Sequence, residues 1–145
     1  MPRIDLSWTW EFNSPLHCGS GISRPGRADR LVQRDKKGSP LIPGDAVKGA
    51  LRMSAEQVAA WLGCPQDYPT DPAEPKCEPI AVLFGGSGKA RFTPALWVNP
   101  GPDHRPPFQT VASTAINPET GVARNETLRM VEVIAPGARF EASCS

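Results

Sequence analysis

Apolar and polar residues alternate near the beginning of the chain. Ile4, Leu6, Trp8, Trp10 and Phe12 occupy every second position, which places their side chains on one face of a β-strand. The even spacing and the bulky side chains favour a central strand that packs against a core.

Apolar residues recur at helical spacing between residues 45 and 62. The positions concerned are Val47, Leu51, Val58 and Leu62. Asp45 is a plausible N-cap, and Gly63 follows the last turn as a stop signal. The sequence therefore predicts one main helix at 45–62.

The rest of the chain is rich in residues that break regular structure. It has 17 prolines and 13 glycines among 145 residues, which excludes a bundle of long helices and favours short strands and loops. A long loop is expected at 13–40 and a proline-rich, acidic insertion at 64–79. Further strands are expected at 90–98, 129–132 and 139–142. The strand–helix–strand order predicts an α+β fold with an antiparallel sheet, of the ferredoxin-like or RNA-recognition type.

The length of the chain, 145 residues, fits a single domain. No apolar run approaches the roughly 18 residues that span a bilayer. Residues 1–10 also lack the layout of a signal peptide. We therefore expect a cytoplasmic protein with no membrane partner.

Positive charge is concentrated in one stretch, although the net charge of the chain is only +1. Between residues 22 and 52, eight basic residues against three acidic ones leave a net charge of +5, so the rest of the chain carries −4. The basic residues are Arg24, Arg27, Arg30, Arg34, Lys36, Lys37, Lys48 and Arg52. Such a stretch on a nearly neutral protein suits a polyanionic partner. An ordinary solvated charged face is the alternative.

The start of the predicted helix, after Pro43-Gly44, offers a place for a phosphate group. The first amides of a helix have no partner within it, and anions bind to them. Lys48 lies one turn into the helix, and Arg52 follows four residues later on the same face. These amides and Lys48 would grip a phosphate. An ordinary solvent-facing pair is the alternative.

Five motifs follow one another along the chain. They are PLHCG at 15–19, GRADRLVQRD at 26–35, IPGDAVKGALR at 42–52, LFGG at 83–86, and a turn followed by Glu132 and APGARF within 116–140. Each motif alone is weak. In this order they resemble the repeat-associated mysterious protein (RAMP) superfamily, in particular the backbone subunit of type III CRISPR effector complexes. The resemblance covers most of the chain.

The resemblance implies an RNA-binding protein of antiviral defence. Such a subunit holds guide RNA, cuts complementary target RNA, and assembles with copies of itself and with other effector subunits. It also implies a thumb hairpin at 112–140, within a single domain at 1–145. Two features depart from the family pattern: Asp45 replaces a small hydroxyl residue, and Ser145 comes before the family's closing strand and glycine-rich loop. We therefore expect a truncated chain, a split subunit or a segment of a fused protein.

The resemblance assigns target cleavage to Asp29, in the long loop. The family uses an aspartate at this place together with a divalent ion such as Mg²⁺. One carboxylate cannot enclose Mg²⁺, which keeps several waters and takes phosphate oxygens as ligands, so Asp29 would hold the ion transiently at the scissile phosphate. The 2′-hydroxyl of the target would attack in line. A surface ion pair with Arg27 or Arg30 is the alternative for Asp29, and Asp35 is interpreted as a structural partner of Arg34.

The residues predicted to contact RNA are basic or lie in the motifs above. His17 corresponds to a histidine that contacts guide RNA in the family, and its imidazole would bond a phosphate or stack on a base. The complete set is His17, Arg24, Arg27, Arg30, Lys48, Arg52, Gly85, Gly86, Lys89 and Arg124.

The four cysteines, at positions 18, 64, 77 and 144, form no Cys-x-x-Cys pair, and disulfides are rare in the cytoplasm. Some relatives carry a zinc knuckle before the Leu-Phe-Gly motif. Cys64 and Cys77, with His104, are therefore candidate ligands of a structural Zn²⁺. Tetrahedral zinc needs four ligands and only these three are nominated, so buried free thiols are the alternative.

Two other functions stay open from the sequence. The first is the same guide-RNA scaffold without cleavage. The second is a guide-processing endoribonuclease of the same superfamily, with His17 as its acid–base group. This enzyme needs a second catalytic side chain such as tyrosine or lysine, and the only tyrosine is Tyr68, in the acidic insertion.

Overall fold

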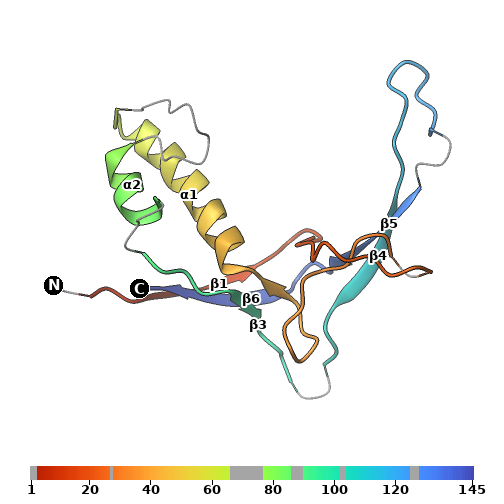
Figure 1. The fold of residues 1–145 in the computed structure, drawn as a ribbon, viewed down its shortest axis with the longest axis horizontal. Helices are drawn as coiled ribbons and strands as arrows, with labels where there is room; N and C mark the ends of the chain where they lie inside the picture. Colours follow the sequence, from red (N-terminus) through yellow and green to blue (C-terminus); the bar gives the residue numbers. More distant parts are fainter. Residues whose placement is uncertain (1–2, 27, 66–76, 86–89, 102–103, 125–127) are drawn as a thin grey trace. The chain divides into compact units, whose positions relative to one another are not determined.

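The computed structural model in Figure 1 describes residues 3–26, 28–65, 77–85, 90–101, 104–124 and 128–145. The RNA contacts predicted for Arg27, Gly86 and Lys89 lie outside these residues, as does Tyr68. None of the helices in the described part of the chain is long and apolar enough to cross a bilayer.

The chain forms two compact units. The first unit comprises Met1–Trp8, Ile42–Ala95 and Ala142–Ser145, and the second comprises Thr9–Leu41 and Leu96–Glu141. The second unit contains the long loop at 13–40, and the first contains both helices.

Four strands form one sheet in the order β1-β6-β3-β2. Their bounds are β1 Leu6–Glu11, β2 Leu41–Ile42, β3 Ala95–Trp97 and β6 Arg139–Cys144. Strands β3 and β6 are antiparallel, with Leu96 opposite Glu141 and Trp97 opposite Phe140. The α+β class with a mainly antiparallel sheet is therefore confirmed.

Only some of the alternating apolar residues at the start of the chain are buried in the structure. Trp8, Trp10 and Phe12 are half-buried, and the Phe12 ring packs edge-on against Phe140, with 5.8 Å between centroids. Ile4 and Leu6 were expected on the same buried face but are 71% and 56% exposed. The alternation predicts correctly which side chains share one face of the strand. It does not show how far along the strand other residues cover that face.

Helix α1 runs from Gly44 to Trp61, which confirms the main helix predicted at 45–62 to within one residue at each end. Its N-cap is Pro43, and no side chain caps it. The N-cap prediction for Asp45 is therefore wrong. Asp45 lies in the first turn instead, where a negative charge is still favourable.

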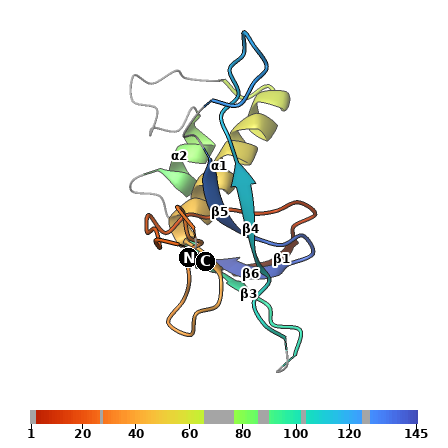
Figure 2. The same ribbon diagram turned by 90° about the vertical axis from the view of Figure 1, so that its right-hand side faces the viewer.

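A second helix, α2, spans Glu78–Phe84 and has a proline in its first turn, where proline needs no partner for the missing N–H. The spacing of apolar residues predicts one main helix and none here. Both views show α2 beside α1 (Figure 1 and Figure 2). Ile80 and Phe84 of α2 form a buried cluster with Ala59 of α1. The Phe84 ring also stacks on Phe92, with 5.4 Å between centroids.

Glycine is required at the start of α1 but not in its middle. A Cβ atom at Gly44 would lie 2.9 Å from the carbonyl oxygen of Phe92, whereas one at Gly49 would meet nothing within 4 Å. We expect Gly44→Ala to lower the free energy of unfolding by roughly 1–3 kcal/mol, because the backbone must move to make room. Gly49→Ala should raise it by about 0.5–1 kcal/mol, because alanine is the better helix former. Urea unfolding followed by circular dichroism measures both, and equal effects would contradict this packing.

Strands β4 (Phe108–Ser113) and β5 (Arg129–Ile134) form a separate antiparallel hairpin. Phe108 lies opposite Ile134 and Ser113 opposite Arg129. This hairpin overlaps the range 112–140 in which a thumb hairpin is expected, and its ladder runs from the pair Phe108 and Ile134 to the pair Ser113 and Arg129. Residues 139–140 belong to β6 in the other sheet.

Among its described residues, 13–26 and 28–40, the long loop has no strand of two or more residues, but isolated backbone bridges hold it in place. These join Leu16 to Ile134, Gly19 to Val32, and Arg34 to Pro40. Ala28 and Val32 are buried. The long loop is therefore an integral part of the second unit and packs along β5.

Candidate functional site

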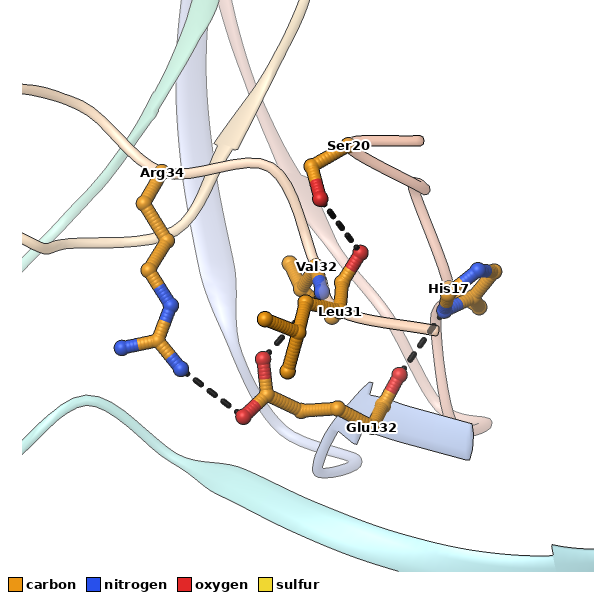
Figure 3. Close-up of polar contacts among 6 residues, drawn as sticks. All are labelled: His17, Ser20, Leu31, Val32, Arg34 and Glu132. Atoms are coloured by element: carbon orange, nitrogen blue, oxygen red, sulfur yellow. Dashed lines mark hydrogen bonds and ion pairs between the residues drawn. The ribbon is translucent and has the colours of Figure 1, made fainter. Parts of the chain in front are cut away.

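The Glu132 carboxylate of strand β5 is the anchor of the long loop (Figure 3). It is 2% exposed. Its Oε2 atom accepts a hydrogen bond from Arg34 Nη2 at 2.8 Å, and its Oε1 atom accepts one from the Val32 N–H at 3.1 Å. The Arg34 guanidinium lies 3.8 Å from the centroid of the Phe108 ring. A buried carboxylate, a cation and an aromatic ring thus fix the loop to both strands of the hairpin.

The backbone of Glu132 positions two of the predicted RNA-binding residues. His17 Nδ1 donates to the Glu132 carbonyl oxygen at 2.8 Å, and the Glu132 N–H donates to the Arg30 carbonyl oxygen at 2.9 Å. With Nδ1 as the donor, Nε2 of the neutral imidazole is an acceptor. A Cβ atom at Gly19 would come within 3.1 Å of this Nε2, so glycine keeps that side of the ring open.

Asp29 lies beside the first residues of β5. Its N–H donates to the Met130 carbonyl oxygen at 2.7 Å, and its Oδ2 accepts from the Met130 N–H at 2.8 Å. The neighbouring Arg30 forms a parallel bridge with Val131. Asp29 is held in place by backbone groups and is still exposed to solvent.

A cavity of about 410 Å³ brings together His17, Asp29 and Arg30. Asp29 is the one acidic residue among the described residues that line it, and Gly19 and Gly21 form part of its wall. An imidazole, a carboxylate and a guanidinium around a small polar hollow can bind a phosphodiester and exchange a proton with it. Here the structure places three sequence-predicted residues at one site.

A thiol lies next in the chain to this site but is poorly suited to chemistry. Burial raises the pKa of the Cys18 thiol above its ordinary value. The thiol is therefore protonated near neutral pH and is a weak nucleophile. This leaves the imidazole and the carboxylate as the reactive groups of the site.

Two other predicted arginines lie elsewhere in the second unit. Arg24 exchanges backbone hydrogen bonds with Ala28 across a turn, and Gly26 in that turn has a φ of 77°. Arg124 is exposed beyond the hairpin strands, where its N–H donates to the Ala115 carbonyl oxygen. Neither residue lines the cavity, so their RNA contacts stay predictions.

The phosphate-binding site predicted at the start of α1 belongs to the first unit. Lys48 Nζ lies 3.4 Å from the Gly85 carbonyl oxygen at the end of α2. Arg52 Nε lies 3.5 Å from Glu56 Oε1, one turn further along α1. Both basic side chains therefore also have structural partners.

Gly85 has a structural explanation of its own. A Cβ atom there would lie 2.5 Å from the Ala81 carbonyl oxygen, so a side chain does not fit without moving the end of α2. The RNA contact predicted for Gly85 stays a prediction.

The described residues give no support to the zinc prediction. Cys77 is buried in the apolar cluster between the helices, and Cys64 packs against that cluster. No group of three or more His, Cys, Asp or Glu side chains that could hold a metal ion occurs among the residues that the structure describes. Those at 66–76, between the two cysteines, lie outside them. The zinc site therefore stays a prediction.

Sequence reasoning missed the roles of Glu132 and Arg34. Arg34 was interpreted as the partner of Asp35, but it pairs with Glu132. Asp35 Oδ1 instead accepts from the N–H groups of Lys37 and Ser39. The one signal in the sequence was the presence of Glu132 in a strand that is apolar apart from Arg129 at its start.

The comparisons with known proteins place this α+β chain in a family. A model of the RAMP superfamily matches residues 9–143. The chain therefore belongs to the RAMP superfamily, which confirms the resemblance of its motifs. No curated protein matches the sequence.

Solved structures share the fold. One is a chain of "Cryo-EM structure of the Type III-B Cmr-beta bound to cognate target RNA", with a TM-score of 0.71, 10% identity, and coverage of 98% of this chain and 84% of that chain. Another is a chain of "Type III-B Cmr-beta Cryo-EM structure of the Apo state", with a TM-score of 0.65, 11% identity, and coverage of 97% and 83%.

Proposed function

We propose that the protein is a guide-RNA-binding backbone subunit of a type III CRISPR effector complex in the cytoplasm. The observation that carries this proposal is the cavity of His17, Asp29 and Arg30, in a chain of the RAMP superfamily. One of the similar structures is named as bound to cognate target RNA. The partners would be guide RNA, target RNA, further copies of the chain and other effector subunits.

We further propose that Asp29 takes part in cutting the target RNA. Its exposed carboxylate lies at the cavity with Arg30, whose guanidinium would bind the phosphate. Asp29 would orient the 2′-hydroxyl of the target and accept its proton as the 2′-oxygen bonds to the adjacent phosphorus. The 5′-oxygen of the next nucleotide would leave as its bond to phosphorus breaks, and it would take a proton from water. A divalent ion such as Mg²⁺ would share the charge that develops on the phosphate. A single carboxylate fits such an ion when RNA phosphate oxygens supply further ligands.

A scaffold without cleavage is the second candidate. The observation that favours it is the bond from the Met130 N–H to Asp29 Oδ2, which gives the carboxylate a structural role of its own. In that case Asp29 would organise the loop, and guide binding would depend on it. The two candidates therefore differ in what an isosteric change at Asp29 should do.

If the start of α1 binds RNA phosphates, it should contribute to the salt dependence of the RNA affinity. Replacing Lys48 and Arg52 together with alanine should weaken binding to single-stranded RNA of any sequence, because phosphate contacts carry no base identity. The plot of log affinity against log salt should become shallower by about 1.4, since each lost contact removes about 0.7. Fluorescence anisotropy at several salt concentrations measures this, with the exposed Arg91 replaced by alanine as the control. An unchanged slope in the double variant would remove the helix start from the RNA-binding surface.

A further inference from the structure

The second unit contains another cavity, of about 370 Å³. It shares no lining residue with the Asp29 cavity. Trp97, from β3, is one of the residues that line it, and Pro100, Pro107 and Pro136 are others. This volume falls within the range of small-molecule pockets.

The walls of this cavity are held by backbone hydrogen bonds. The Val98 N–H donates to the Arg139 carbonyl oxygen at 2.9 Å, and the Ala135 N–H donates to that of Pro107 at 2.8 Å. The Gly137 N–H donates to the Phe12 carbonyl oxygen at 2.7 Å. The pocket is therefore formed before a ligand arrives, and little conformational entropy is lost when one binds.

The charge of the lining favours an anionic ligand. Arg139 Nε and Glu11 Oε2 form an ion pair at 2.9 Å, so these two charges cancel. His104 and Arg105 also line the cavity, and both are exposed. Among the described lining residues, the uncompensated charge is therefore positive.

We propose that this cavity binds one unpaired nucleotide of RNA, with its base on Trp97 and its phosphate at His104 and Arg105. An indole accepts the face of any base, and a guanidinium suits a phosphate. The ion pair between Arg139 and Glu11 would border the pocket without repelling the phosphate. The inference rests on the proposed function only for the nature of the ligand, and it adds a contact far in sequence from the loop and from α1.

The test uses the full chain and a fluorescein-labelled single-stranded RNA of five nucleotides, with an RNA duplex for comparison. Trp97→Leu should weaken binding of the single strand at least about fivefold, the loss expected for one stacked base. The double substitution of His104 and Arg105 by alanine should weaken it several-fold and reduce the salt dependence. Arg91→Ala is the matched control. Because Trp97 is half-buried, thermal unfolding checks that variant, and the exposed double variant tests the site independently of folding.

Photo-crosslinking of the bound RNA, mapped by mass spectrometry, should place a nucleotide on Trp97 or His104. Wild-type affinity in both variants, together with a crosslink only at the Asp29 cavity, would overturn the inference and leave the proposed function intact. A wild-type protein that binds no RNA would overturn both. Tighter binding of a glutamate-rich peptide than of RNA at this cavity would assign it to a protein partner, which contradicts the inference.

Discussion

Replacing Glu132 with alanine is expected to lower the free energy of unfolding by about 3 kcal/mol. Removing one member of a buried ion pair leaves the other charge without compensation, which costs about 3–5 kcal/mol. The lower end applies because the Arg34 side chain is 32% exposed and water can partly replace the carboxylate. The Val32 N–H loses its acceptor as well. Urea unfolding at neutral pH measures the change.

Two further variants isolate the cause of this effect. Glu132→Gln keeps a hydrogen-bond acceptor for the Val32 N–H but removes the charge, so it should be less damaging than alanine. Arg139→Ala breaks a pair whose side chains are 62% and 50% exposed, and it should change stability by less than about 1 kcal/mol. If Glu132→Ala were as mild as Arg139→Ala, Glu132 would not be the anchor of the loop.

Replacing Asp29 with asparagine is expected to reduce cleavage of target RNA by about 10²–10⁴-fold, the usual contribution of a positioned general base. The amide oxygen of asparagine can still accept the bond from the Met130 N–H that Asp29 Oδ2 accepts at 2.8 Å. The substitution therefore removes the charge and leaves the loop in place. Guide RNA binding should stay at the wild-type level. Cleavage of a labelled complementary RNA by the assembled complex, with and without EDTA, measures the effect.

Asp35→Asn is the matched control, because Asp35 lies in the same loop and its Oδ1 atom accepts hydrogen bonds from the backbone N–H groups of Lys37 and Ser39. It should cleave at the wild-type rate. Full cleavage by the Asp29→Asn complex would leave the scaffold function standing. Loss of guide binding would show that the charge of Asp29 organises the loop instead of acting on the target.

The spacing of apolar residues predicted the main helix, whose formation depends largely on local sequence. The helix at 45–62 has four apolar residues at regular spacing and was found as α1. Helix α2 has only seven residues, too few to show a clear period. Pro79 within it and Gly85 directly after it also resemble turn signals. It is stabilised by packing on Ala59 and Phe92, which no local pattern reports.

The sequence predicted the reactive groups of the candidate site but not the residue that holds them in place. His17 and Asp29 stood out because they lie in recognisable motifs, and the structure brings them to one cavity. Glu132 is 100 residues from Val32 in sequence, so its role depends on the path of the whole loop. The sequence alone also does not reveal that Glu132 is only 2% exposed.

The most direct test of the central claim is to purify the protein with its natural complex and to sequence the RNA that comes with it. We expect small RNAs of discrete length, at an amount comparable with that of the protein. We also expect the Lys48 and Arg52 double variant to retain less of this RNA than the Arg91 control does. A complex without RNA, or one with random fragments of abundant cellular RNA, would contradict the claim that this chain holds guide RNA.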